Sequence, residues 1–246
     1  MLNGLDLFSG IGGLSVALAP WARPVAYCEN DRYDQSDLLC RMANGLLPVA
    51  PIWDDVRTLR REHLPSIDMV YGGFPCQDIS VAGRGAGLEG NKSSLFLHVV
   101  RITEEVKPAL VFLENSPAIR TRGLSRVVLE LARLGFHARW TVVSAQEVGA
   151  CHERKRWFLL AAHPDRIDIR VQYWRRFGSP GESAPKHLSA RKQGFIARTS
   201  TGLTQPRVDR AGDGIPHRMD RLRALGNAVV PLQAREAFKR LAGIGG

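Results

Sequence analysis

Short apolar runs alternate with stretches of helical periodicity along the first two thirds of the chain. Apolar runs that end at glycine or proline are typical of buried strands, and the stretches between them repeat apolar residues every three or four positions. This alternation predicts a parallel sheet with crossover helices. The predicted strands are Gly4–Phe8, Pro24–Glu29, Met69–Gly72, Leu110–Glu114, His137–Val143 and Trp157–Ala162. The predicted helices are Gly13–Ala19, Tyr33–Met42, Leu95–Val106 and Leu124–Leu134.

The pattern changes after the last of these strands. Periodicity fades from His163 to Pro216, where glycine, proline, serine and arginine are frequent. Within Arg221–Leu241 a helical pattern resumes after the stretch "GNAVVP" at 226–231. We therefore expect a main domain over residues 1–162, a loop-rich region over 163–215, and a C-terminal segment over 216–246 that returns to the main domain.

Charge is unevenly distributed over these parts. The net charge is +10, and residues 1–162 carry 18 Lys and Arg against 17 Asp and Glu, whereas residues 163–218 carry 11 against 5. In the later region aromatic side chains stand among arginines, at Arg170, Tyr173, Trp174, Arg175, Arg176 and Phe177. Such a surface suits a polyanion whose bases can stack, so nucleic acid is the predicted partner. A solvated basic face is the alternative.

Composition argues against several other classes. No apolar run approaches the length of a membrane span, and Leu2–Leu7 is too short for a signal peptide. The four cysteines lie far apart without CxxC spacing, so the sequence predicts neither a zinc site nor a disulfide framework. We expect a soluble protein of a reducing, cytoplasmic compartment, with no metal and no membrane contact.

One glycine-rich turn indicates a ligand. In "DLFSGIGGL", residues 6–14, an apolar strand breaks into glycines before a helix, which lets the backbone approach a ligand closely. Glu29, in "YCEN", ends the second strand about 20 residues downstream, the place from which a carboxylate holds ribose hydroxyls. Asp54 and Asp55, in "WDDV", follow the next segment and could meet an adenine amino group. A nucleotide-like cofactor is predicted, and a plain strand-to-helix turn is the alternative.

A thiol and a carboxylate follow two further strands. Cys76 stands in "GGFPCQDIS" after Met69–Gly72, and Glu114 stands in "LENS". A free cysteine is more often a small buried hydrophobe than a nucleophile. However, the carboxyl ends of parallel strands meet in one crevice, and an unpaired buried carboxylate is costly. The pair therefore favours a catalytic site over packing.

Five stretches occur in an order that identifies a family. They are "DLFSGIGG", "GGFPCQDIS" with "AGRGAGLEGNKSSLF", "LENS", "HERKRWF" and "RLRALGNAVVP". With them the chain resembles the DNA (cytosine-5) methyltransferases, over nearly everything except residues 163–215. The resemblance implies an α/β, Rossmann-like methyltransferase fold with a mostly parallel sheet, helices on both faces and a small loop-rich target-recognition region. That region is short for the family, and Ser116 and His152 stand where valine and glutamine are usual.

The resemblance also implies roles for individual residues. Cys76 is expected to be the nucleophile, Glu114 the acid that holds the base, and Arg154 and Arg156 the cations beside the substrate. The expected cofactor contacts are Phe8, Ser9, Gly10, Gly12, Glu29, Asn30, Asp54, Asp55, Val56, Pro75, Asn227 and Ala228. The expected substrate contacts are Gln77, Ser80, Arg84, Arg175 and Arg176.

The implied reaction is methylation of cytosine in double-stranded DNA, with S-adenosylmethionine as the cofactor. Cys76 would add to C6 of a flipped-out cytosine, so that C5 can accept the methyl group. We expect a monomer, in a bacterial or phage-infected cell. A restriction-modification enzyme, a phage enzyme and a solitary regulator share these motifs, so the choice among them stays open.

Three alternatives remain at this point. An RNA cytosine-5 methyltransferase would use the same thiol and acid. A nicotinamide oxidoreductase shares the glycine turn and Glu29 but gives no role to Cys76 and Glu114. A non-catalytic DNA-binding module could use the same fold, although the intact pair of Cys76 and Glu114 argues against it.

Overall fold

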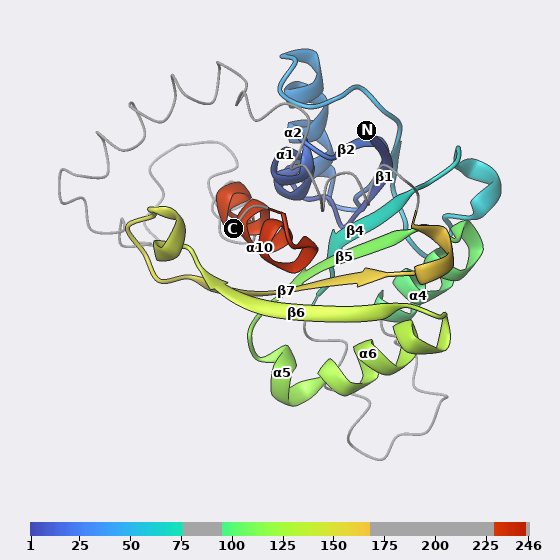
Figure 1. Cartoon of the computed structure of the whole chain (residues 1–246). Helices are drawn as coiled ribbons and strands as arrows, with labels where there is room; N and C mark the ends of the chain where they lie inside the picture. The colour runs from blue at the N-terminus through green and yellow to red at the C-terminus, as the bar shows by residue number, and fades with distance from the viewer. Residues whose placement is uncertain (76–94, 168–228, 245–246) are drawn as a thin grey trace.

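A sheet with the strand order β3-β2-β1-β4-β5-β7-β6 runs through the computed structural model, which describes residues 1–75, 95–167 and 229–244 (Figure 1). The strands are β1 (Leu2–Leu7), β2 (Ala22–Cys28), β3 (Ile52–Trp53), β4 (Met69–Gly73), β5 (Leu110–Asn115), β6 (His137–Ser144) and β7 (Lys155–Ala162). The five strands from β3 to β5 are parallel, and β7 is antiparallel to both of its neighbours. The prediction of a mostly parallel sheet is confirmed.

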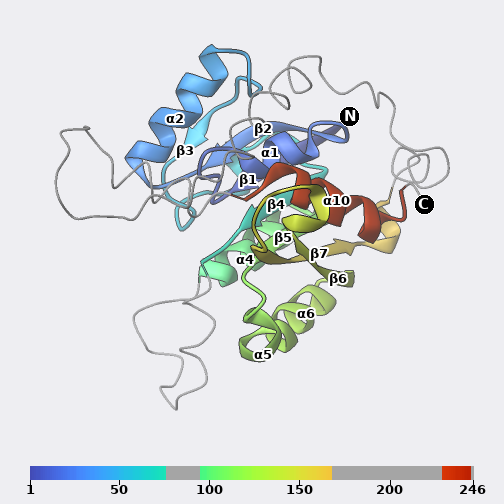
Figure 2. The same cartoon turned by 90° about the vertical axis from the view of Figure 1, so that its left-hand side faces the viewer.

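Helices cover both faces of this sheet, as predicted (Figures 1 and 2). They are α1 (Gly13–Leu18), α2 (Arg32–Ala43), α4 (Leu95–Val106), α5 (Ile119–Arg122), α6 (Leu124–Arg133) and α10 (Pro231–Ala242). Short 3-10 turns are η1 (Arg61–His63), η3 (Gln146–Val148) and η4 (Pro164–Arg166). Apolar side chains of α4 and α6 form one core layer, and those of α1 and α10 form the other.

The central strand β5 shows why the strands read as continuous apolar runs. Val111 and Leu113 face the layer of α4 and α6, whereas Leu110 and Phe112 face the layer of α1 and α10. A strand buried on both faces has no polar alternation to reveal it. Its first polar side chain, Glu114, appears where the strand reaches the carboxyl edge of the sheet.

The helix predicted after "GNAVVP" is present as α10 and contributes to the core. Phe238 lies edge-on to Phe112, with ring centroids 5.4 Å apart, and packs against Trp21 at 4.7 Å. The three rings are almost fully buried. The boundaries expected near 162 and 215 stay a prediction, since residues 168–228 lie outside the described part of the chain.

Residues 1–75, 95–167 and 229–244 contain neither a membrane-spanning helix nor a cluster of metal ligands. None of the helices there has the length and apolar content needed to cross a bilayer. The same residues bring together no group of three His, Cys, Asp or Glu side chains with metal-binding potential.

The aromatic packing of α10 predicts a stability effect. Phe238→Ala should lower the free energy of unfolding by about 3–5 kcal/mol, the usual cost of removing a buried phenyl ring. Leu232→Ala, on the exposed side of the same helix, should cost about 1 kcal/mol or less. Urea unfolding followed by circular dichroism measures both, and equal small losses would show that α10 is not part of the cooperative core.

Candidate active site

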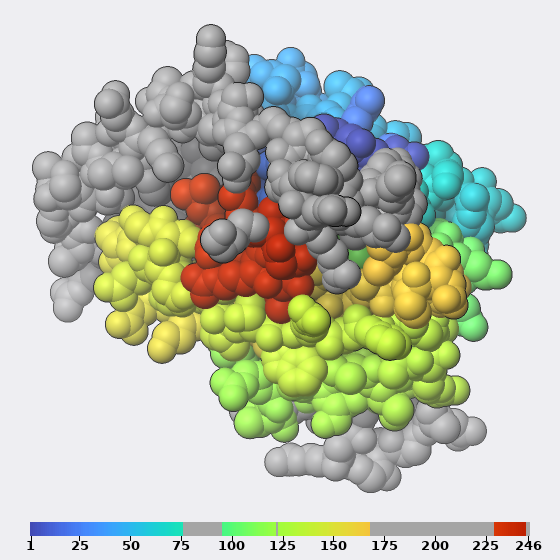
Figure 3. Space-filling view, viewed as in Figure 1, coloured from blue at the N-terminus to red at the C-terminus, as the bar shows by residue number. Residues whose placement is uncertain are grey.

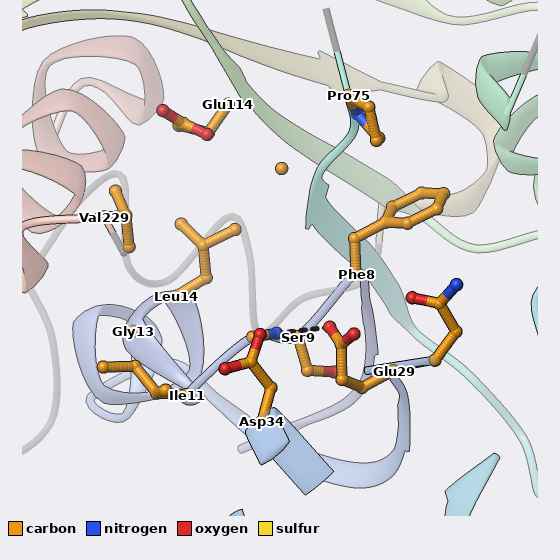
Figure 4. A pocket seen from close by; sticks show the side chains of 13 residues that line it. Phe8, Ser9, Ile11, Gly13, Leu14, Glu29, Asp34, Pro75, Glu114 and Val229 are labelled. Atoms are coloured by element: carbon orange, nitrogen blue, oxygen red, sulfur yellow. Dashed lines mark hydrogen bonds between the residues drawn. The ribbon is translucent and has the colours of Figure 1, made fainter. Parts of the chain in front are cut away.

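A cavity of about 210 Å³ lies at the carboxyl edge of the parallel strands (Figure 4). The ends of β1, β2, β4 and β5 contribute to its wall, together with α1, α2 and the segment that leads into α10. Seven residues expected at the site line it: Phe8, Ser9, Gly10, Glu29, Asn30, Pro75 and Glu114. The structure therefore brings most of the described candidates into one place. Open α/β sheets bind ligands in this crevice, at the carboxyl ends of their strands.

The carboxylate of Glu29 holds the glycine turn. Its Oε2 accepts a hydrogen bond from the backbone N–H of Gly10 at 2.7 Å, and its Oε1 accepts one from the backbone N–H of Asp31 at 2.8 Å. Glu29 is 8% exposed, so these bonds form in a largely desolvated place. Each oxygen has a second lone pair, so the carboxylate can still accept hydrogen bonds from a ligand in the cavity.

The turn itself needs unusual backbone geometry. Gly10 and Gly12 have φ of 51° and 80°, in the left-handed region that glycine adopts without strain. Phe8 has φ of 54°, a rare conformation for an aromatic residue, and its ring lies at the cavity. Gly13 is required for another reason, because a Cβ there would lie 2.7 Å from Cγ1 of Val229.

A buried series of hydrogen-bonded side chains, Asp6, Ser15 and Tyr71, lies beneath the glycine turn. Asp6 is fully buried and accepts a hydrogen bond from the Ser15 hydroxyl at 2.6 Å, and that hydroxyl lies 2.9 Å from the Tyr71 hydroxyl. This series joins β1, the first turn of α1 and β4. Burial raises the pKa of Asp6 well above its usual range.

On the opposite side of the cavity, Glu114 pairs with Arg156. Nε of Arg156 lies 2.9 Å from Oε1 of Glu114, and the two side chains are 23% and 13% exposed. Gly73 leaves room for this carboxylate, since a Cβ at Gly73 would stand 2.7 Å from Oε2 of Glu114. Figure 4 shows Glu114 across the cavity from Glu29.

The environment of Glu114 shifts its titration. Burial raises the pKa of Glu114 above its ordinary value, and the nearby cations Arg156 and Arg154 oppose that rise. Burial and the charge of Arg156 lower the pKa of Arg154. A carboxyl group with a raised pKa can hold a proton closer to neutral pH and act as an acid.

Next to Glu114, Asn115 fixes the end of β4. Its Nδ2 donates to the backbone carbonyl of Phe74 at 2.8 Å, and its Oδ1 accepts from the backbone N–H of Ser116. Cys76 follows Phe74 by two residues in the sequence. Asn115 is therefore a further residue of the site region that motif spacing alone did not single out.

Four described candidates stand away from this cavity. Asp54 is exposed and lines a separate hollow with Gln35 and Leu39, and Val56 is buried in the core. Asp55 forms a bidentate pair with Arg57, with N–O distances of 2.8–3.0 Å. Gly12 shapes the turn without lining the cavity. Their expected contacts with a cofactor stay predictions.

The remaining candidates are Arg154, which is described, and a group that lies outside the described residues. Arg154 lies in the segment that enters β7, near Glu114. The candidates without a described position are Cys76, Gln77, Ser80, Arg84, Arg175, Arg176, Asn227 and Ala228.

The cavity also has lining residues that we did not predict, namely Ile11, Gly13, Leu14, Asp34, Gly73 and Val229. Ile11, Gly13 and Leu14 belong to the quoted glycine stretch, and Gly73 and Val229 belong to other quoted motifs. Position within a motif was thus the signal that could have found most of them. Asp34 carried only a weak signal, as an acidic residue in the first turn of α2.

The chain is similar in sequence to known methyltransferases. Residues 2–197 match the profile of the family described as C-5 cytosine-specific DNA methylase. The type II methyltransferase M.CviJI of Paramecium bursaria Chlorella virus IL3A is 40% identical over 163 residues, which cover 65% of this chain and 43% of that protein. The type II methyltransferase M.HhaI of Haemophilus parahaemolyticus is 30% identical over 189 residues, 74% of this chain and 54% of that protein. The chain spans about half the length of these curated relatives.

Solved structures share the fold. The Dnmt2 methyltransferase of S. pombe superposes with a TM-score of 0.55 and 19% identity, over 74% of this chain and 57% of that one. The Entamoeba histolytica methyltransferase EhMeth gives a TM-score of 0.55 and 18% identity, over 69% and 55% of the two chains.

The bonds of Glu29 predict a local loss of stability. Glu29→Gln keeps the shape but points an amide N–H at one of the two backbone N–H groups, which should cost about 1–3 kcal/mol of unfolding free energy. Hydrogen exchange should accelerate at the amide that loses its acceptor, which is that of Gly10 or that of Asp31. Asp54→Asn, at an exposed acid, is the control and should change neither quantity. Unaltered exchange in Glu29→Gln would refute the assignment of these bonds.

Proposed function

Because the chain belongs to the C-5 cytosine-specific DNA methylases, we propose that it transfers a methyl group from S-adenosylmethionine to C5 of a cytosine in double-stranded DNA. One observation carries the proposal. A single cavity has a ligand-facing carboxylate, Glu29, on one side and a buried acid–arginine pair, Glu114 and Arg156, on the other. The first suits a nucleoside cofactor, and the second suits a polar base.

The cofactor side fits S-adenosylmethionine. Glu29 retains lone pairs for two ribose hydroxyls, and the turn at Gly10 is open, because a Cβ there would meet no atom within 4 Å. The ring of Phe8 offers an apolar surface at the same wall. When bound, the cofactor would supply an electrophilic methyl group.

The groups on the Glu114 side of the cavity would activate the cytosine ring for methyl transfer. C5 of cytosine is a poor nucleophile, and the thiolate of Cys76 would add to C6 to form an S–C6 bond and make C5 electron-rich. Glu114, in its protonated form, would donate to N3 and offset the negative charge that develops on the ring. Arg156 would hold the O2 carbonyl.

Product formation then restores the aromatic ring. After C5 has gained the methyl carbon, a water-mediated base removes the proton from C5, and the electron pair of that C–H bond reforms the C5–C6 double bond. Cys76 leaves as the thiolate. The ring edge is inaccessible inside a duplex, so the target cytosine must be flipped out.

The expected organisation follows the same proposal. The domain over 1–162 would bind the cofactor and carry catalysis, the basic region over 163–215 would recognise the target, and 216–246 would complete the domain. Arg175 and Arg176 would contact phosphates.

The type II methyltransferases among the relatives support a role in restriction-modification. Family membership removes the nicotinamide oxidoreductase from the alternatives.

A mechanism-based substrate tests the role of Cys76. Duplex DNA with 5-fluorocytosine at the target should accept the methyl group but cannot lose fluorine as a cation, so the enzyme should stay covalently bound. The adduct should require S-adenosylmethionine and map by mass spectrometry to the peptide with "PCQ". Cys76→Ser should abolish it. Turnover without an adduct would contradict the proposal, and a matched RNA substrate in parallel distinguishes DNA from RNA.

Glu114 should determine the alkaline side of the pH profile. If the protonated acid is the active form, kcat falls as pH rises through the raised pKa of Glu114, and Glu114→Gln should lack that fall. The maximal rate of Glu114→Gln should be about 10²–10⁴ times lower than that of the wild type, because an amide donates a hydrogen bond but no proton. Glu104→Gln, at an exposed position of α4, is the control. A wild-type rate and profile in Glu114→Gln would rule out this role.

A further inference from the structure

The position of Arg156 depends on the hairpin formed by β6 and β7. Arg156 stands opposite Val143 in the antiparallel register, near the end of the hairpin where Ser144 and Lys155 form the last pair. Beyond this pair the regular ladder gives way to the connecting residues 145–154, which contain only the short turn η3. Something must hold this end if Arg156 is to remain against Glu114.

Gln233 provides a contact at this place. Its Nε2 donates to the backbone carbonyl of Val143 at 2.6 Å and to that of Arg154 at 2.7 Å, so one amide group joins both strands. The carbonyl of Arg154 also accepts the backbone N–H of Ala145 at 3.0 Å. The bridge thus closes the hairpin within two residues of Arg156.

The bridge is built into the protein interior. Gln233 is completely buried although α10 lies on the surface of this face (Figure 3). A buried amide needs hydrogen-bond partners to offset its desolvation, and both donors of Gln233 have them. Its Oε1 has no partner among the described residues. An apolar side chain would fill the same space without the desolvation penalty of an unpaired oxygen, so packing alone does not explain a glutamine here.

We propose that Gln233 is a positioning residue for methyl transfer, which holds the β6–β7 hairpin so that Arg156 stays against Glu114. This inference rests on the proposed function and adds a residue that contacts neither the cavity nor the ion pair. The expected effect is on the chemical step, because a small misplacement of a catalytic group can cost up to about a hundredfold in rate.

A neighbour on the same helix serves a different part of the site. Arg235 donates from Nε to the carbonyl of Ala17 at 3.1 Å and from Nη2 to that of Val16 at 3.0 Å. These carbonyls belong to the last turn of α1, which carries the glycine turn at its start. Variants of Gln233 and Arg235 should therefore affect the base side and the cofactor side separately.

The experiment compares Gln233→Met with Arg235→Met and Leu232→Met in the full chain. Methionine resembles glutamine in shape and removes the donors without opening a large cavity. We expect Gln233→Met to lower kcat about tenfold while KM for S-adenosylmethionine changes less than twofold. Arg235→Met should raise that KM more than it lowers kcat. Leu232→Met, at an exposed position, should match the wild type.

The pH profile separates positioning from a general loss of stability. The described charges that shift the titration of Glu114 are Arg156 and Arg154, which both lower its pKa. If Gln233→Met releases them, the pKa of Glu114 rises, and the fall of kcat with pH moves to higher pH. A merely destabilised enzyme would lose active fraction without moving this limb, and that result would overturn the inference.

Hydrogen exchange gives a readout that does not depend on activity. Amides of residues 143–157 should exchange faster in Gln233→Met than in Leu232→Met if the bridge holds the hairpin. Equal exchange overturns the inference. A wild-type protein that transfers no methyl group overturns the proposed function instead, and the exchange result still decides whether Gln233 holds the hairpin.

Discussion

A buried carboxylate that needs a cation is the constraint on which this site depends. Glu114 ends a parallel strand, so its side chain emerges at the carboxyl edge of the sheet. A neighbouring parallel strand would also end there and would begin at the far edge. Because β7 is antiparallel to β5, its first residues reach the carboxyl edge, and Arg156 arrives beside Glu114. The reversed strand therefore offsets the electrostatic cost of the buried acid.

The two carboxylates of the cavity are satisfied in different ways, and the difference fits their proposed tasks. Glu29 accepts backbone N–H groups, which fix its position and leave lone pairs for hydroxyl groups. Glu114 faces a guanidinium group in a desolvated place, where burial and the nearby cations shift its pKa in opposite directions. Backbone donors hold a group still, whereas a side-chain cation can move to a ligand. The first arrangement suits binding, and the second suits proton transfer to or from a base.

Much of this could be predicted from the sequence, because strand ends and motifs are local features. Glu29 and Glu114 were found from their places after apolar runs, and the cavity does join them. The two-residue strand β3 was not predicted, since Ile52 and Trp53 are too short a run to show periodicity. Asp55 pairs with Arg57, a contact that its motif does not reveal, and its expected contact with a cofactor stays a prediction. Local pattern thus found the longer strands and the two carboxylates, whereas a two-residue strand and contacts between side chains lay beyond it.

The contribution of α10 lay furthest beyond sequence reasoning, because its contacts join residues about 80 to over 200 positions apart. Val229 packs on Gly13, Arg235 holds the end of α1, and Gln233 closes the hairpin that carries Arg156. The helix follows residues 163–215 in the chain, and it bonds to α1 and to the β6–β7 hairpin. A parallel sheet leaves its carboxyl edge open, and the elements around that edge must be fixed by something other than the strands. Here a single helix is hydrogen-bonded to the last turn of α1 and to the β6–β7 hairpin, so it joins the element that follows the glycine turn to the hairpin that carries Arg156.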